Sequence, residues 1–165
     1  MELVADASVL IDLHNGELTI AAFSLPHHWV TPDVIAHQLQ RPSFESLEKA
    51  GLQVIELSPG EVDLVSDLSA TYKKPGRQDL FALALAKSRQ MTLIAGDKDL
   101  RNAAEAEKVP VHGTLWVLDQ LVNDRYLPPA VAVSSLSLIV ERGARLPQPE
   151  ITARLRLWQG RHGEE

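Results

Sequence analysis

Short apolar runs in this chain alternate with longer segments in which apolar residues recur at helical spacing. The short runs predict five strands, near residues 3–5, 29–31, 52–57, 91–95 and 109–112. The helical spacing predicts helices over residues 7–13, 33–39, 44–50, 58–72, 78–89, 97–108, 113–124, 128–142 and 149–158. Strands that alternate with helices are typical of a parallel sheet covered on both faces. We therefore expect an α/β fold with three α/β/α layers and a central parallel sheet of about five strands.

Three local signals support particular elements of this fold. Residues 58–61 read Ser-Pro-Gly-Glu, which is typical of a helix start with Ser as N-cap and Glu three residues later. Residues 80–86 are apolar on every side, which indicates a buried helix. Pro110 cannot donate a backbone hydrogen bond, so it indicates that the last strand lies at a sheet edge.

The end of the chain differs from the rest in charge and in hydropathy. The formal net charge is −6, but within residues 142–163 a single acid stands against Arg142, Arg145, Arg154, Arg156 and Arg161. Residues 131–140 are too apolar for an exposed helix, so we expect them to pack on the core or on a second copy. We expect one domain over residues 1–165, with a core over about 2–125 and a helical extension over about 128–160.

The composition excludes several classes of protein. The 165 residues include no cysteine, which excludes disulfides, thiolate zinc sites and cysteine nucleophiles. No apolar run approaches the roughly 20 residues of a membrane helix, and the first residues lack the basic region of a signal peptide. We therefore expect a cytoplasmic protein without a membrane partner. The acidic balance argues against a simple nucleic-acid coat, but not against an enzyme whose acids hold metal.

Acidic residues follow two of the predicted strands. Asp6 follows the first strand, Asp97 and Asp99 follow the fourth, and Asp79 lies in the first turn of the buried helix. Functional groups of parallel sheets gather beyond the carboxyl ends of the strands, so we expect these side chains near one point. Crowded carboxylates disfavour one another's charge, and a hard divalent cation such as Mg²⁺ relieves that repulsion. Such ions activate water and stabilise the leaving oxygen of a phosphodiester.

A purely structural role accounts for the same acids one at a time. Asp is a preferred N-cap, and Asp6, Asp79 and Asp97 each stand at a predicted helix start. Asp99 lies in a first turn, where an acid complements the helix dipole. Both interpretations stay open at this point. The joint arrangement favours a shared site, because a sheet needs no acids at two strand ends and beside a buried helix.

Four segments carry a resemblance to a known family. Residues 4–11 read Val-Ala-Asp-Ala-Ser-Val-Leu-Ile, and residues 78–84 read Gln-Asp-Leu-Phe-Ala-Leu-Ala. Residues 93–100 read Leu-Ile-Ala-Gly-Asp-Lys-Asp-Leu, and residues 111–118 read Val-His-Gly-Thr-Leu-Trp-Val-Leu. In this order they resemble the PIN-domain family, over about residues 2–125. The resemblance implies a ribonuclease that depends on Mg²⁺ or Mn²⁺, and many small members of the family are toxins held inactive by an antitoxin.

The resemblance also implies roles for single residues. Asp6, Asp79 and Asp97 match the family's catalytic, metal-binding acids. Asp99 matches a fourth metal ligand, and Ser8 matches an auxiliary polar group.

Two positions depart from the family's pattern. Gln38 stands where the family usually has a Glu, and it is a further auxiliary candidate because an amide oxygen can bind metal. Ala95 stands where a Ser or Thr is usual. Both departures remove polar function from the expected site, which favours weakened or lost catalysis.

The sequence supports three functional hypotheses. The first is a metal-dependent endoribonuclease that acts as the toxin of a toxin–antitoxin pair, with RNA, an antitoxin protein and a second copy in a homodimer as partners. Its RNA- or partner-binding residues would be Arg142, Arg145, Arg154 and Arg156. The second is a catalytically degenerate domain of the same family that binds RNA or a partner. The third is a haloacid dehalogenase-type phosphatase, which ranks last because Ser8 stands where that family needs a second acid.

Overall fold

The predicted strands form one sheet in the computed structural model, which describes residues 1–161. The strands are β1 (Glu2–Ala5), β2 (His28–Pro32), β3 (Gln53–Ile55), β4 (Thr92–Ile94) and β5 (Val111–His112). All of their pairings are parallel, and the order across the sheet is β3-β2-β1-β4-β5. β5 is an edge strand, as Pro110 predicts. The expectation of an α/β fold with a central parallel sheet is confirmed.

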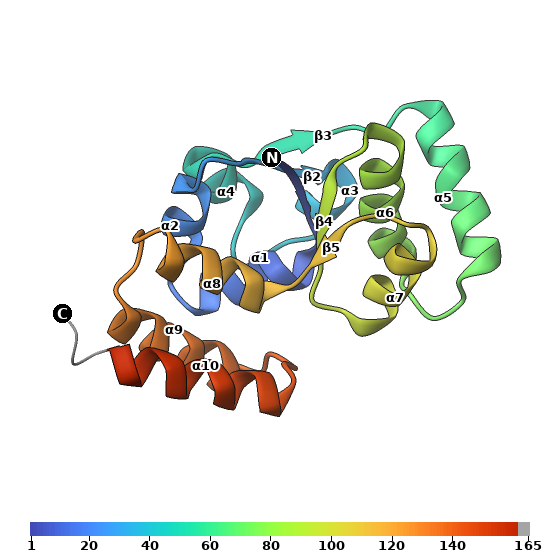
Figure 1. Cartoon of the computed structure of the whole chain (residues 1–165). Helices are drawn as coiled ribbons and strands as arrows, with labels where there is room; N and C mark the ends of the chain where they lie inside the picture. Colours follow the sequence, from blue (N-terminus) through green and yellow to red (C-terminus); the bar gives the residue numbers. More distant parts are fainter. Residues whose placement is uncertain (162–165) are drawn as a thin grey trace.

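Helices cover the sheet on both faces, and the alternation of side chains along β1 divides the interior into two cores (Figure 1). Leu3 and Ala5 belong to one core and Val4 to the other, because successive side chains of a strand point to opposite faces. The Leu3 core includes residues of α1 (Ala7–Asn15), α2 (Thr19–Ser24), α4 (Phe44–Ala50), α8 (Thr114–Asn123), α9 (Pro129–Glu141) and α10 (Gln148–Arg161). The Val4 core includes residues of α3 (Asp33–Ala36), α5 (Pro59–Thr71), α6 (Arg77–Arg89) and α7 (Lys98–Ala106).

The register between β1 and β4 brings the two acid-bearing strand ends together. Val4 pairs with Leu93 and Ala5 with Ile94. The Asp6 backbone N–H then donates to the Ile94 carbonyl at 3.0 Å, which extends the ladder by one bond. Since the strands are parallel and adjacent, the residues that follow them leave the sheet at the same edge.

Two helices form as their local sequence predicts, α5 with its capping box and the apolar α6. The Ser58 hydroxyl accepts from the Glu61 backbone N–H, and the Glu61 carboxylate accepts from the Ser58 N–H, so α5 begins with the predicted capping box. Residue 80 and residues 82–86 of α6 are buried. This helix is therefore enclosed by the sheet and its neighbouring helices, as its apolar sequence predicts.

Two helices differ from the predictions made from spacing. α2 was not predicted, because it is short, begins without a side-chain cap bond and buries only Ala22. Its position depends on the tertiary structure, in which the Trp29 indole donates to the Ala22 carbonyl at 3.1 Å. α3 ends at Ala36 instead of near residue 39. The His37 N–H still bonds four residues back, but the N–H groups of Gln38 and Leu39 bond three residues back, which is a tightened turn and not a further turn of α-helix.

The apolar segment 131–140 packs within its own chain. It forms most of α9, which contacts α1, α8 and α10, and its buried residues include Leu136 and Ile139. α10 lies beside α9 (Figure 1) and inserts Trp158, whose surface is 1% exposed, into the Leu3 core. Among residues 1–161, no helix combines the length and the apolar character needed to cross a membrane.

We predict that the attachment of α10 depends on Trp158. Trp158→Ala should lower the free energy of unfolding by about 3–5 kcal/mol, because it removes a large buried ring and leaves a cavity. Leu157→Ala is the matched control, since Leu157 is 51% exposed and should cost under about 0.5 kcal/mol. Urea unfolding followed by circular dichroism measures both. Equal losses in the two variants would contradict the packing described here.

Candidate active site

Asp6 follows β1, caps α1 and is 1% exposed. Its carboxylate accepts hydrogen bonds from the Val9 N–H at 2.8 Å and from the Gly96 N–H at 3.2 Å. The Ser8 hydroxyl, 2.9 Å from both carboxylate oxygens, donates to the same group. Burial raises the pKa of Asp6 to about 6 against the effect of these hydrogen bonds, and the charge of Asp79 contributes to the rise.

Ser8 of α1 and Gly96, which follows β4, both hydrogen-bond to this carboxylate. The Gly96 N–H lies 3.1 Å from the Ser8 hydroxyl oxygen as well as 3.2 Å from Asp6. A Cβ atom at position 96 would lie only 2.6 Å from the Ser8 Oγ, so a side chain there would displace the hydroxyl. Glycine at position 96 therefore leaves the room in which the Ser8 hydroxyl reaches Asp6, and the auxiliary role of Ser8 stays a prediction.

Asp79 and Asp97 stand at two further helix starts on the same edge of the sheet. Asp79 lies in the first turn of α6 and accepts from the Gly76 N–H at 3.2 Å. Asp97 caps α7 and accepts from the Leu100 N–H at 3.0 Å. Partial burial raises the pKa of Asp79, and the charge of Asp97 contributes to that rise. The three predicted acids thus interact electrostatically, with Asp79 coupled to both Asp6 and Asp97.

This geometry is compatible with both interpretations of the acids, as helix caps and as a shared site. Each carboxylate accepts a hydrogen bond at the start of its own helix. The charge of Asp79 also contributes to the raised pKa of Asp6, and the charge of Asp97 to that of Asp79. Among residues 1–161, no three acidic or histidine side chains are gathered tightly enough to form a ready-made metal site. The donor set still fits Mg²⁺ or Mn²⁺, because such ions keep several water ligands and need only one or two carboxylates.

The structure places Asp99 at the same pocket as Asp97, Ala95 in the core and Gln38 at the surface. Asp99 lies in the first turn of α7 and lines the same pocket as Asp97. Ala95 directly follows β4, is buried and offers no polar side-chain group. Gln38 is exposed, and its side chain makes no hydrogen bond within residues 1–161. No hydrogen bond in that part of the chain joins the Gln38 side chain to the acids.

Sequence reasoning missed Asp12. It lies on the buried face of α1, is 8% exposed, and accepts a hydrogen bond from the Thr114 hydroxyl at 2.9 Å. Burial raises the pKa of Asp12. An acid among the apolar positions of an amphipathic helix is the signal that would have found it, since charged residues are rarely buried without a reason.

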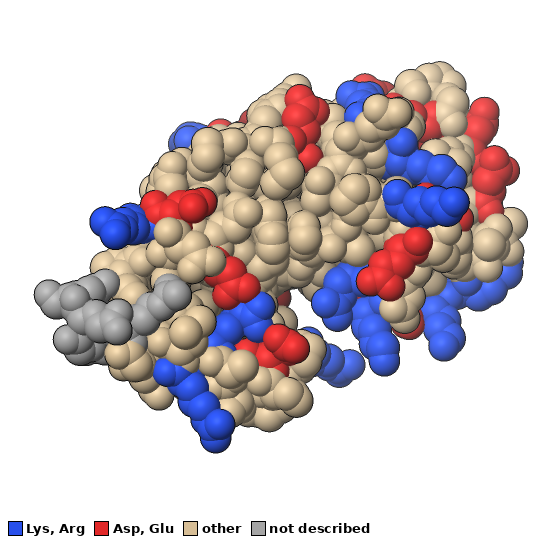
Figure 2. All heavy atoms as spheres, in the orientation of Figure 1, with Lys and Arg blue, Asp and Glu red and all other residues tan. Residues whose placement is uncertain are grey.

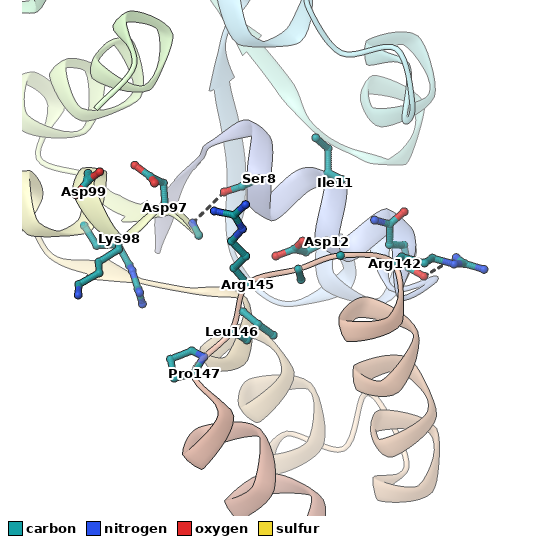
Figure 3. Close-up of a pocket in the computed structure, with 15 residues that line it drawn as sticks. Ser8, Ile11, Asp12, Asp97, Lys98, Asp99, Arg142, Arg145, Leu146 and Pro147 are labelled. Atoms are coloured by element: carbon teal, nitrogen blue, oxygen red, sulfur yellow. Dashed lines mark hydrogen bonds between the residues drawn. The ribbon is translucent and has the colours of Figure 1, made fainter. Parts of the chain in front are cut away.

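A pocket of about 780 Å³ opens beside the strand ends. Its floor includes Ser8, Asp12 and Gly96, and α7 contributes its first turn. The turn at residues 142–147, between α9 and α10, closes the opposite side. Figure 3 shows the Arg145 side chain extending from this turn toward Ser8. The C-terminal helices therefore build one wall of the candidate site.

The predicted C-terminal arginines have different surroundings. Arg154 is held by Asp119 at 2.7 Å and by Glu150 at 2.9 Å, so its charge is already paired. Arg142 donates to the Asn15 carbonyl and lines the 780 Å³ pocket together with Arg145. Arg156 is exposed on α10 and lines neither of the pockets described here.

Comparison with known proteins agrees with this fold. A family model described as a PIN domain matches residues 2–160. The chain is similar to the solved structure of a PilT N-terminus domain protein from the hyperthermophilic archaeon Sulfolobus solfataricus P2, at 18% sequence identity and a TM-score of 0.55. That alignment covers 74% of this chain and 94% of the other. Among curated proteins, none matches this chain.

The fold and the matched family model define the class of protein. The chain belongs to the PIN-domain family, whose members are generally nucleases that use divalent metal ions.

The raised pKa of Asp6 predicts a pH dependence of stability. Between about pH 4 and pH 6 the folded state holds a proton on Asp6 that the unfolded chain has released, so stability falls as the pH rises through this window. The shift from 3.8 to about 6 corresponds to about 3 kcal/mol. Urea unfolding in EDTA should show that the wild type loses about this much more than Asp6→Asn between pH 4 and pH 7.

Asp63→Asn provides the control for this measurement, because Asp63 is an exposed residue of α5 with no partner within residues 1–161. Its pH profile should follow that of the wild type. Parallel profiles for the wild type and Asp6→Asn would show that Asp6 ionises normally in the folded protein.

Proposed function

We propose that this protein is a metal-dependent endoribonuclease that hydrolyses RNA phosphodiester bonds. The carrying observation is geometric: the pairing of β1 with β4 brings Asp6 to the Gly96 N–H, next to Asp97 at the start of α7. Asp79 stands at the start of α6, and its charge contributes to the raised pKa of Asp6. Membership of the PIN-domain family supports the nuclease class. A parallel sheet that collects acids from separate elements at its carboxyl edge is also the usual location of a functional site.

Asp6, Asp79 and Asp97 would hold Mg²⁺ or Mn²⁺, and Asp99 would add a fourth carboxylate at the pocket side. The metal would supply a bound water of lowered pKa and a Lewis acid for the phosphodiester oxygens. The chain itself positions the acids: Ser8 and Gly96 fix the Asp6 carboxylate, while the starts of α6 and α7 fix Asp79 and Asp97. The repulsion among the three acids is the reason a cation would bind there.

A second candidate function is a PIN domain that binds RNA or a partner without cutting. Two observations favour it: Gln38 is exposed where the family usually has a Glu, and within residues 1–161 no three acids stand ready-made around one point. A protein antitoxin, a homodimer and a cytoplasmic location are predictions from the sequence that accompany either candidate.

Nuclease activity on single-stranded RNA in Mn²⁺ tests the first candidate. Asp6→Asn, Asp79→Asn and Asp97→Asn should each lower the cleavage rate by about 100-fold or more, because a bound metal contributes several kcal/mol to the transition state. Asp63→Asn removes one exposed carboxylate from α5 and should retain the wild-type rate. Cleavage that survives in all three site variants would assign the activity to a contaminating nuclease.

Thermal unfolding with increasing Mn²⁺ separates the two candidates. A site that binds the folded state should add about 2.7 kcal/mol of stability when Mn²⁺ is 100-fold above its dissociation constant. Asp79→Asn should reduce this gain, and Asp63→Asn should keep it. Stabilisation without cleavage would support the non-cutting domain, and the absence of both would remove the metal site from either candidate.

A further inference from the structure

Two arginines line the pocket beside the candidate site, Arg101 half-buried and Arg145 exposed. Arg101 comes from α7, and Arg145 comes from the turn between α9 and α10. Both line the 780 Å³ pocket, and both also line an adjoining pocket of about 410 Å³. They therefore stand where the two pockets meet. Gly96, whose backbone N–H donates to Asp6, also lines both pockets. Asp97 and Asp99 line the larger pocket, whereas Asp6 and Asp79 line neither of the two.

Neither arginine has a partner within residues 1–161. No carboxylate there forms an ion pair with Arg101 or Arg145, and the Nε atom of Arg101 is buried without a hydrogen-bond acceptor. The other half-buried arginine on this side of the molecule, Arg154, is satisfied by two carboxylates. A buried guanidinium N–H without an acceptor costs on the order of 1–3 kcal/mol, so an unpaired Arg101 indicates that an external acceptor completes the site.

The chemistry of the junction fits a phosphate. A guanidinium presents its donors in a planar fork that matches two oxygens of one phosphate, so two such groups that line one pocket can bind the same anion. Lys98 and Arg142 line the same pocket, so four basic residues accompany the acids Asp12, Asp97 and Asp99. Figure 2 shows Lys and Arg side chains gathered around the hollow between α10 and the α7 side of the molecule.

We propose that Arg101 and Arg145 form a clamp for a backbone phosphate of single-stranded RNA, next to the phosphodiester that would be cut. This inference rests on the proposed nucleic-acid substrate, although it does not require cleavage. The strand would pass between α7 and the turn at residues 142–147. The helical pair α9–α10 would then be part of the substrate site, and its role would go beyond covering the Leu3 core.

Binding of fluorescein-labelled single-stranded RNA tests the clamp by fluorescence anisotropy in Mn²⁺. Asp6→Asn serves as the parent protein, so that the strand stays intact during the measurement. Adding Arg101→Ala or Arg145→Ala should weaken binding at least tenfold at low salt. The slope of log Kd against log salt should fall by about 0.7 for each lost phosphate contact, as expected for single strands.

Lys49→Ala in the same parent is the charge-matched control, because Lys49 is exposed on α4 and lines neither pocket. It should change Kd less than twofold. Arg101→Ala should also leave the melting temperature unchanged or raised, since it removes a cation without a partner. Arg101→Gln offers a second variant should the alanine variant misfold.

The outcomes separate this inference from the proposed nuclease activity. Weakened binding in both arginine variants, with a normal Lys49→Ala control, supports the clamp even where the wild type cuts no RNA. Unchanged affinity and salt slope in Arg101→Ala and Arg145→Ala overturn it, even where the wild type is an active nuclease. Equal weakening in Lys49→Ala also overturns it, because general attraction to the surface would then explain the binding. A parent protein that binds no RNA overturns it as well.

Discussion

The parallel pairing of β1 with β4 is the constraint on which the rest of the molecule depends. Parallel strands need long crossover connections and cover on both faces, so β1 and β4 become the buried centre of the sheet. Their in-register pairing sets Ala5 beside Ile94, and the chain leaves both strands at one edge. Asp6 and Gly96 are therefore brought within hydrogen-bond distance, although 90 residues separate them in the chain.

Burial of Asp6 carries a cost that its surroundings only partly offset. Backbone N–H groups from Val9 and Gly96 and the Ser8 hydroxyl stabilise the carboxylate, yet burial still raises its pKa to about 6. A capping role alone is met by many exposed Asp residues at helix starts. Burial is the main cause of that rise, and the charge of Asp79 adds to it. In the proposed function, a cation bound beside Asp6 would offset both effects by stabilising the ionised carboxylate.

The sequence allowed prediction of the features that depend on local pattern. The strands, the capping box at Ser58 and the apolar α6 follow from periodicity and turn chemistry, and the acids at the strand ends follow from the rule for parallel sheets. Features set by tertiary contact could not be predicted in this way. The sequence predicts Arg154 as a binding residue together with its neighbouring arginines, but the structure pairs it with Asp119 of α8, a contact that no local pattern indicates.

The pattern of the sequence also gives no indication that Arg101 and Asp12 belong to the candidate site. Arg101 lies in an ordinary amphipathic helix, and it lines a pocket because the turn at residues 142–147 packs opposite α7 in the folded chain. Asp12 is inconspicuous in the sequence until Thr114, more than 100 residues later, is placed against it. In both cases the neighbouring residues come from a distant part of the chain, and local periodicity does not predict such a tertiary contact.

The position of Arg145 on the turn between α9 and α10 would make the last helices part of substrate recognition. Both helices share the Leu3 core with β1 and α1, and Trp158 of α10 is buried there, so the packing of that core also places the turn at residues 142–147. A partner that shifted α10 would therefore change RNA binding through Arg145 without contacting the acids.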